Sequence, residues 1–529
     1  MAGMLHASIF MNLINKYSKT EYLFMKNSNG TGWMRALLTV IITFRRLKQV
    51  FTTEALIIII VGMMQCGQAA AQTFQDNSNS DARLRVATPL MAHPSHGPVV
   101  PPFSRPEALF TDPFGMTSWL RARGIALTMD NTNEYTAAIS KPTPGYSNYK
   151  QGSSNAGQMN TALHINWEKI IGLKGFATHA LFTSRYGTTA NRMMGDWLAH
   201  SSEIYGGGGN VVVHLVTAYG EENLLGGRVS IAGGRLTEMS EFSASSLFCN
   251  FQNNGFCGRP KAAIDNQYIT SYPAGEWGFR VRGRPSRYIY IQAGVYFAER
   301  GIYANSQHRT GFHFNSSNIV GQLAPVELGW EPLLGHQHKL PGHYKIGGQV
   351  ISAPNPDNYY DDQGRPYALS GRTARNHQQT WSTWFEVDQK VLHHSYSNAE
   401  GGLTAMSGVI YNDPRTSLRN YEAYVAFVDR GFIRSRPYDS FGVVMTYVKI
   451  APGVSDTDML DLSMVPAKTA PNHATGVQGH ETIFETNYQI HVMRGVVFAP
   501  DFQIYFRPNA QKNLKNVEFV GFKSQIQIL

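Results

Sequence analysis

The amino-acid sequence predicts an all-β fold: a closed antiparallel β-barrel of about 16 strands, of the kind that spans the outer membrane of Gram-negative bacteria. Two observations lead to this prediction. Segments in which apolar and polar residues alternate recur from Trp119 to Leu529, and an export signal precedes them. After that signal, no apolar run reaches the roughly 18 residues that a membrane-spanning helix requires.

The composition favours a β-barrel over other classes of protein. The chain has 529 residues, of which 43% are hydrophobic and only 16% are charged, and its mean hydropathy is -0.25. That value excludes a polytopic helical membrane protein but fits a barrel, because the lumen side of a barrel is polar. The net charge of +9 comes from dispersed cations rather than from a basic run, so we predict no nucleic-acid partner.

Three regions follow one another along the chain. A basic flank, the apolar run Ala55–Met64 and the small residues at 69–71 predict a cleaved signal peptide with a long N-terminal extension, residues 1–71. Residues 72–115 are rich in Pro, Ser and Asp, which predicts an extended arm or linker. Residues 116–529 form the predicted transmembrane barrel, and the signal peptide implies that the barrel is located in the cell outer membrane.

The clearest alternation lies between Trp277 and Phe297. In its first half, three apolar side chains share one face and three arginines share the other, namely Trp277, Phe279 and Val281 against Arg280, Arg282 and Arg284. A Gly-Arg-Pro-Ser turn then leads into a second alternating run that starts at Tyr288. Successive side chains of a strand point to opposite faces, so we expect the apolar face to meet lipid and the arginines to face the lumen.

The same pattern predicts the other strands in order along the chain. No window of about 11–18 residues in the mature chain has a convincing helical apolar period, so no long helix is expected. Short connections alternate with long polar loops, as they do between the periplasmic and outer ends of such barrels. These strands are predicted at 124–130, 158–167, 176–185, 211–219, 227–233, 326–330, 344–351, 382–388, 403–411, 422–428, 441–449, 481–492, 501–506 and 517–529.

The mature chain keeps two cysteines, Cys249 and Cys257, because Cys66 falls within the predicted signal peptide. Exported proteins meet an oxidising environment, so we expect these two residues to form a local disulfide. Closing so short a loop is expected to stabilise it by about 2–3 kcal/mol.

Three stretches carry a resemblance to a known family. They are Leu247–Pro260 (LFCNFQNNGFCGRP) followed by Trp277-Gly-Phe-Arg280 and Gly294-Val-Tyr296; Gly431–Asp439 (GFIRSRPYD), with its Arg-Pro-x-Asp segment; and Glu481-x3-Glu485-x2-Tyr488 followed by Pro500-x2-Gln503-x4-Pro508. In this order they resemble the carbohydrate-selective porin family, and the resemblance extends from about Trp119 to the end of the chain.

The resemblance implies an outer-membrane porin, a barrel of about 16 strands through which small sugars diffuse passively into the periplasm. The partners it implies are mono- or oligosaccharides and outer-membrane lipid. Both a monomer and a homotrimer are compatible with the sequence. We expect no enzymatic activity, no cofactor and no metal.

Candidate residues for the sugar path are side chains that would line the lumen. Arg280, Arg282 and Arg284 offer planar hydrogen-bond donors, and carboxylates accept from sugar hydroxyls. The candidates beside the arginines are Glu481, Glu485, Glu386 and Asp388, with Trp384 as an aromatic surface. We expect the arginines to face Glu481 and Glu485 across a constriction; the alternative is that all these charges only solvate the wall and pair with one another. We expect Arg436 and Asp439 to organise a turn, because Pro437 lies between them.

Two other classes of protein remain open at this point. One is a barrel enzyme of the lipase or protease type, although the sequence has no H-E-x-x-H, G-x-S-x-G or Walker motif. His336-x-His338 and His393-His394 are weak metal signals without a third ligand at fixed spacing. The other class is a secreted sugar-binding β-sandwich. Against it stands the number of strands with large aromatic residues on the apolar face.

Overall fold

The computed structural model describes residues 108–204, 211–264, 272–301, 310–312, 314, 316–335, 340–396, 401–464 and 473–529. The predicted signal peptide, residues 1–71, lies outside these ranges, as does the predicted arm up to residue 107. The statements that follow concern the described residues. No helix among them is long and apolar enough to cross a membrane.

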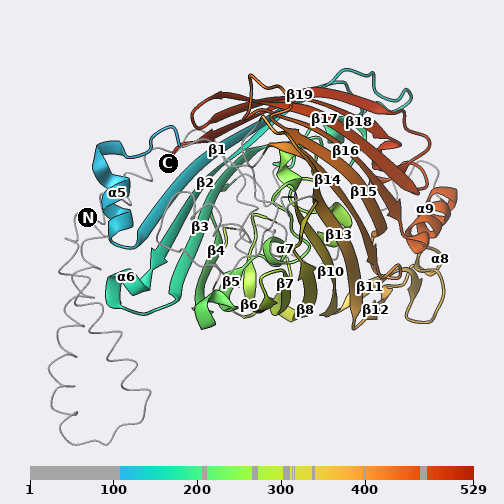
Figure 1. Ribbon diagram of the computed structural model, residues 1–529. Helices are drawn as coiled ribbons and strands as arrows, with labels where there is room; N and C mark the ends of the chain where they lie inside the picture. Colours follow the sequence, from blue (N-terminus) through green and yellow to red (C-terminus); the bar gives the residue numbers. More distant parts are fainter. Residues whose placement is uncertain are drawn as a thin grey trace, which may run out of the picture. The chain divides into compact units, whose positions relative to one another are not determined.

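Sixteen strands form one closed antiparallel barrel (Figure 1). The barrel closes where β1 (Ile125–Ala138) pairs with β2 (Ser153–Asn166) on one side and with β19 (Val517–Gln527) on the other. The predicted fold class is therefore confirmed. The other barrel strands are β3 (Phe176–Gly187), β4 (Val211–Leu224), β5 (Val229–Leu236), β6 (Glu276–Ser286), β7 (Ile289–Glu299), β8 (Ile319–Trp330), β10 (Leu340–Ser352), β13 (Thr380–His393), β14 (Gly402–Asn412), β15 (Arg419–Arg430), β16 (Ser440–Ile450), β17 (His480–Met493) and β18 (Val496–Phe506).

Short and long connections alternate around the barrel. The helix α6 (Trp167–Ile171) lies in a short connection, and α5 (Met116–Ala122) precedes β1 at the same end. The helices α8 (Tyr367–Ser370) and α9 (Pro452–Met464) lie in long connections at the opposite end (Figure 1). In outer-membrane barrels the short turns face the periplasm, so the end that carries α8 and α9 is the extracellular end. The smaller elements are β9 (Leu333–Leu334), the hairpin β11 (Asn355–Asp361) and β12 (Ala374–His377), and the 3-10 turns η2 (Pro113–Gly115), η4 (Leu225–Gly227) and η10 (Pro508–Ala510).

The two faces of the barrel wall have the polarity that the alternation predicts. In β6 the Phe279 side chain points outward and is 47% exposed, whereas the neighbouring Arg280 is 2% exposed on the lumen side. In β7 Ile291 is 52% exposed and Tyr290 only 4%. The outward face is thus apolar and the inward face polar, as lipid on one side and a polar lumen on the other require.

Each of the sixteen predicted strands is confirmed, but their ends and the helices were predicted less well. β1 continues to Ala138, beyond its predicted end at Asp130. The residues that follow Asp130 are polar on both faces of the strand, so the sequence shows no alternation there. Trp119, where we expected the alternation to begin, lies in α5. The expectation of no long helix is wrong for α9. Its buried residues are spaced as in a helix, but three of the four are polar: Val454, Thr457, Asp458 and Asp461.

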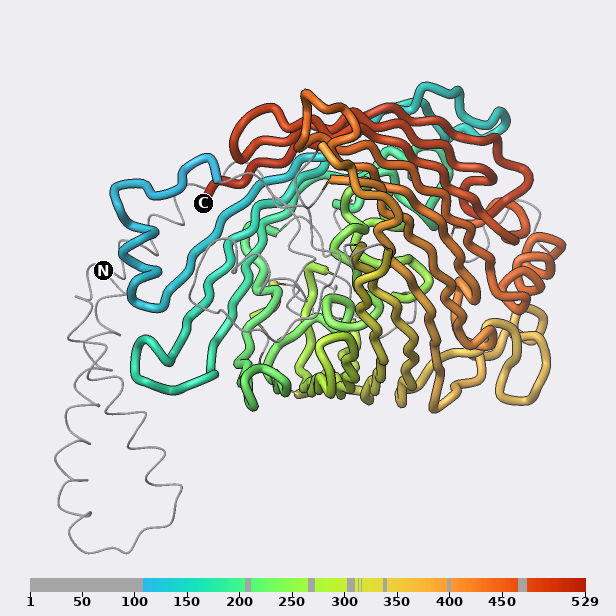
Figure 2. The backbone as a smooth tube through the Cα atoms, in the orientation of Figure 1, coloured from blue at the N-terminus to red at the C-terminus, as the bar shows by residue number. Residues whose placement is uncertain are grey.

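A segment of the connection between β5 and β6, residues 237–264, runs inside the barrel, and we call it the lumen loop. It contains α7 (Glu238–Glu241) and the 3-10 turns η5 (Phe248–Asn250) and η6 (Lys261–Ile264). Figure 1 shows α7 inside the ring of strands, and Figure 2 shows the course of the backbone there. Five large apolar side chains of the loop pack in one cluster with residues of the wall: Phe242, Leu247, Phe248, Phe251 and Phe256.

The predicted disulfide is present at the tip of this loop. Cys249 and Cys257 are bonded, and their Cα atoms are 4.4 Å apart, within the roughly 7 Å that a disulfide can bridge. The bond closes the segment 249–257, which we call the aromatic knob. Within it, the Phe256 ring lies 4.9 Å from the ring of Phe248 and 4.9 Å from that of Tyr424 on β15. The disulfide therefore holds together the part of the loop that fits into the lumen.

Replacing both cysteines with serine should destabilise the knob by about 2–3 kcal/mol, because the reduced chain regains the freedom that loop closure removes. The expected result is faster protease cleavage within 237–264 at a temperature where the barrel still resists unfolding in detergent. Thiol labelling of the parent protein, denatured without reductant, is the accompanying measurement. Reaction of two thiols per chain would contradict the bonded state.

The helix α9 packs against the extracellular hairpin through buried polar contacts. The Thr457 hydroxyl donates to the carbonyl of Asn358 at 2.7 Å, and the Asp458 carboxyl accepts from the backbone N–H of Gln478 at 3.0 Å. Asp458 is fully buried. Burial raises the pKa of Asp458 from 3.8 to about 7; the hydrogen bond from Gln478 opposes this rise and the nearby Asp461 adds to it.

The docking of α9 should therefore weaken as the pH rises. A folded-state pKa above the unfolded value means that the contribution is fully present below about pH 4 and is lost as the pH passes through about 7. We expect the hydrogen-exchange protection of α9, corrected for intrinsic rates, to fall over this range in the parent protein. It should stay level in Asp458→Asn, which keeps an acceptor for Gln478 but does not titrate. An unchanged pH dependence in the variant would show that another group is responsible.

Candidate functional site

The candidate site is the part of the lumen where the lumen loop meets the arginines of β6. The alternation of β6 brings Arg280, Arg282 and Arg284 to the inner face of the wall, as predicted. Glu241, in the last turn of α7, forms ion pairs with two of them: its Oε2 lies 3.0 Å from Arg280 Nε and 3.0 Å from Arg282 Nη2, which donates to it. The loop and the wall are thus joined by one carboxylate that bridges two guanidinium groups.

Each arginine of the ladder is paired with carboxylate. Arg280 Nη2 also lies 3.2 Å from Glu221 of β4, and Arg284 Nη1 lies 2.6 Å from Glu331 after β8. The Arg282 side chain is the most exposed of the three, at 11% compared with 3% for Arg280. Charged groups of opposite sign therefore neutralise one another along this wall, and Arg282 is the arginine most open to the lumen.

The prediction that this ladder faces Glu481 and Glu485 is wrong. Glu485, on β17, is fully buried beneath the lumen loop and accepts from the backbone N–H groups of Gln252 at 2.6 Å and Asn253 at 2.8 Å, and from the Asn253 side chain at 2.6 Å. An inward carboxylate can meet either an arginine or the N–H groups of an inserted loop. The alternation of β17 does not distinguish these two partners.

Glu481 meets a second inserted segment. Residues 188–204, which include η3 (Asn191–Met194), connect β3 to β4, and Glu481 is hydrogen-bonded to Asp196 of this segment. Burial raises the pKa of the Asp196 carboxyl, and hydrogen bonds from Asn191 and from backbone N–H groups oppose the rise. Two carboxyl groups in contact are favourable when they share a proton. Glu481 is thus buried against another carboxyl group, at 1% exposure, and is not paired with an arginine of β6.

The other acidic candidates also hold the lumen loop. Glu386 accepts from the Ser243 hydroxyl at 2.9 Å and pairs with Lys345 at 3.2 Å. Asp388 accepts from the Ser245 hydroxyl at 2.7 Å. Both carboxylates are almost completely buried. The structure thus brings Glu386 and Asp388 together with the loop, and separates them from the arginine ladder.

Trp384 reaches across β10 to Glu327, a residue that sequence reasoning missed. The Trp384 indole N–H donates to Glu327 at 2.8 Å, and its ring covers Gly347, where a Cβ atom would come within 2.5 Å of it. Glu327 is 1% exposed and also accepts from the loop. Its full set of donors is Trp384, the Tyr290 hydroxyl, Gln292 and the backbone N–H of Ser243. A lone glutamate at an inward position of β8 is the only signal that the sequence offers for it.

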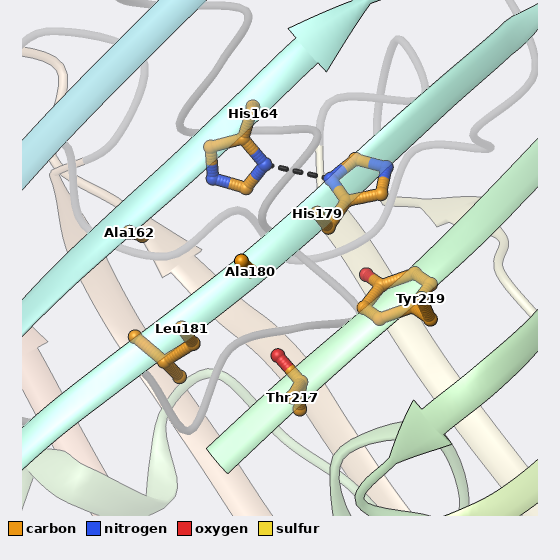
Figure 3. Close-up of a pocket in the computed structure, with 7 residues that line it drawn as sticks. All are labelled: Ala162, His164, His179, Ala180, Leu181, Thr217 and Tyr219. Carbon is orange, nitrogen blue, oxygen red and sulfur yellow. Dashed lines mark hydrogen bonds between the residues drawn. The ribbon is translucent and has the colours of Figure 1, made fainter. Parts of the chain in front are cut away.

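Beyond Glu221, the partner of Arg280, the inward polar side chains continue with a pair of histidines, His164 on β2 and His179 on β3. His179 Nε2 lies 3.6 Å from Glu221, and the Nδ1 atoms of His164 and His179 are 2.6 Å apart (Figure 3). The Tyr219 ring stacks on His179, with centroids 4.8 Å apart. These side chains line a small hollow in the wall. The histidines were not predicted as site residues, although both occupy inward positions in the alternation.

Comparison with known proteins identifies the family. The model of the carbohydrate-selective porin family, OprB, matches residues 150–528. The chain belongs to this family. Porin B of Pseudomonas aeruginosa is 26% identical over 418 residues, which cover 78% of this chain and 89% of the relative. The putative porin QuiX of Acinetobacter baylyi is 24% identical over 380 residues, 70% of this chain and 83% of the relative. A solved structure, the high-pH structure of Pseudomonas putida OprB, has the same fold, with a TM-score of 0.73 and 22% identity over 80% of this chain and 99% of that one.

Membership of a channel family decides between the classes that the sequence left open. A carbohydrate-selective porin is an outer-membrane channel, and membership of this family implies a non-enzymatic protein. The closed barrel excludes the β-sandwich. Among the described residues, no three His, Cys, Asp or Glu side chains gather as a metal site would require. His393 and His394 contact the Gly401 carbonyl at 2.9 Å and Asp429 at 2.7 Å, respectively. The His336-x-His338 segment lies outside the described residues.

The predicted turn-organising role of Arg436 and Asp439 is confirmed in the porin. Arg436 Nε donates to Asp439 Oδ2 at 2.9 Å, across the short connection between β15 and β16. Asp439 also accepts from the Tyr488 hydroxyl at 2.8 Å and from the backbone N–H of His491 at 2.9 Å. The pair therefore closes its own turn and attaches it to β17, away from the lumen.

Loss of the Glu485 carboxylate should release the lumen loop of this porin. Replacement by Ala leaves the N–H groups of Gln252 and Asn253 without their acceptor, at about 1–3 kcal/mol for each buried donor. In Glu485→Ala we expect a higher single-channel conductance in planar bilayers, together with faster protease cleavage of residues 237–264.

A matched control is Glu518→Ala, which removes an exposed carboxylate from the outer face of β19. We expect the parent conductance in this control. If Glu485→Ala conducts like the parent and its loop remains resistant to protease, Glu485 does not anchor the loop.

Proposed function

We propose that small neutral sugars diffuse passively through the narrow space between the lumen loop and the β6 wall, and that Arg282 is the principal hydrogen-bond donor to them. The observation that carries this proposal is the bridge from Glu241 to Arg280 and Arg282, which brings the loop close to the arginine ladder. The greater exposure of Arg282 supports its selection. Membership of the carbohydrate-selective family supports a sugar as the solute.

Charge balance in this region favours an uncharged, polyhydroxylated solute. The three arginines are accompanied by Glu221, Glu241 and Glu331, so the wall presents donors and acceptors without a single-sign ring. Rings of one sign select ions of the other, and a balanced wall does not. Sugar hydroxyls both donate and accept, and they are therefore suited to such a surface.

Binding in such a passage has to be weak for transport to be fast. Each neutral hydrogen bond contributes about 0.5–1.5 kcal/mol net against water. A few of them correspond to a dissociation constant of about 1 mM, at which a solute is both attracted and released. We therefore propose a low-affinity site and no energy coupling.

We propose an indirect role for Glu481, Glu485, Glu386, Asp388 and Trp384. Their contacts with the lumen loop, with residues 188–204 and with Glu327 support a role in holding the constriction in place rather than in touching the sugar. We also propose that the chain reaches the outer membrane after cleavage of the signal peptide, residues 1–71.

Arg282→Ala should weaken the block of ion conductance by sugar and leave the barrel folded. The variant loses the donors that face the lumen, so the concentration of glucose or maltose needed for half-maximal block should rise several-fold, as the loss of one to two hydrogen bonds predicts, at about 1 kcal/mol each. Conductance blocked by titrated sugar in a planar bilayer measures this change.

The matched control is Arg287→Ala, which removes an exposed arginine from the turn of the same hairpin, between β6 and β7. It should show the sugar block of the parent. Equal sugar block in Arg282→Ala and the parent would remove Arg282 from the path, and the family assignment would be unaffected.

A further inference from the structure

Four basic residues gather on the outer face of the barrel at its extracellular end. Lys449, near the end of β16, is directly opposite His480, the first residue of β17. Both point outward, because their neighbours Val448 and Glu481 are buried on the lumen side. Arg507 follows β18, and its Nη1 lies 3.3 Å from His480 Nδ1. Lys512, in the connection between β18 and β19, lies close enough to act electrostatically on His480. We call these four residues the rim cluster.

The rim cluster differs from the lumen arginines in having no acidic partner within the described residues. The charged groups that act on the His480 ring are Arg507, Lys512 and Lys449, all of the same sign. Within the described part of the chain, no carboxylate forms an ion pair with any of the three. Arg507, Lys449 and Lys512 carry charges of the same sign around this ring, and an anion bound among them would offset their mutual repulsion.

The position of the cluster defines the depth of that anion in the membrane. Tyr421 of β15 pairs directly with Lys449, and the outward Tyr411 of β14 pairs with Tyr421. Girdles of aromatic residues mark the two membrane–water interfaces of outer-membrane barrels. The outward aromatic residues beside the rim cluster are Trp381, Tyr411, Tyr421, Tyr447 and Phe506. The cluster is therefore level with the headgroups of the outer leaflet.

We propose that the rim cluster binds the phosphate groups of a phosphorylated lipid in the outer leaflet. Basic groups at a membrane surface attract anionic lipid headgroups. Arg507 presents a planar fork that fits a phosphate, and Lys449 and Lys512 add point charges beside it. The girdle supplies apolar and aromatic surface for the acyl chains of the same lipid. This site is separate from the sugar path, because it lies on the opposite face of the strands.

The test uses the full-length mature porin in detergent, with bisphosphorylated lipid A as the probe and native mass spectrometry as the readout of bound lipid. The triple variant Lys449→Gln, Arg507→Gln, Lys512→Gln should bind lipid A at least about tenfold more weakly than the parent. Phosphatidylethanolamine, which has no net charge, should bind both proteins equally weakly.

A matched triple control removes the same number of charges from exposed lysines at the same end of the barrel: Lys141→Gln, Lys150→Gln, Lys515→Gln. The control should retain lipid A within about twofold, since its lysines lie outside the cluster. Equal loss in the two triple variants would reduce the effect to overall charge and overturn the proposal. Unchanged binding in the first triple variant would overturn it as well.

Two further measurements separate the outcomes. Inorganic phosphate at millimolar concentration should not displace lipid A; if it binds as tightly as lipid A, the site takes a free anion and not a lipid.

Parent-like conductance of the triple variant would verify folding, since the cluster lies outside the lumen. If the triple variant does not fold, the single variants Lys449→Gln and Arg507→Gln replace it, and full retention of lipid A by both would be contrary to the proposal.

Discussion

The backbone of an irregular segment inside a membrane barrel needs hydrogen-bond partners, and this requirement determines much of the lumen of this porin. Unpaired N–H groups at that depth are costly, so non-helical segments are tolerated only where protein groups satisfy them. Here the partners are carboxylates of the wall. The N–H groups they receive belong to Ser243, Gln252, Asn253 and Ala262 of the lumen loop and to Ile204 of the segment 188–204, and the acceptors are Glu327, Glu485, Glu422 and Glu134.

The charge pattern of the constriction follows from this anchoring. Several inward carboxylates accept from the backbone of the inserted segments, and the arginines of β6 pair with Glu221, Glu331 and the carboxylate that the loop itself brings, Glu241. The aromatic knob with its disulfide occupies the lumen beside them. The charges along this wall are therefore balanced, which supports the proposal that the porin favours sugars over ions.

Alternation along the strands was sufficient to predict the barrel, because lipid on one face and a polar lumen on the other impose a period of two on every strand. It was sufficient to predict that Arg280 and Arg282 face inward. It was insufficient to predict their partners, because a contact such as that between Gln252 and Glu485 joins residues 233 positions apart and depends on the path of a loop without periodic sequence. The ends of β1 and the helix α9 were missed for a related reason: their buried positions are polar, and polarity is what the pattern uses to identify exposure.

The period of two also couples the lumen to the outer surface. In β17, His480 belongs to the rim cluster on the outer face, and the next residue, Glu481, points to Asp196 inside the barrel. A shift of register by one residue would place a carboxylate in the headgroup region and an imidazole in the lumen, at a cost on both faces. Register is therefore fixed from two sides, by aromatic rows outside and by loop contacts inside. Adjacent residues of one strand face the lumen and the lipid in turn. A substitution on the inward face therefore alters transport, and one on the outward face alters lipid contact, although both faces belong to the same strands.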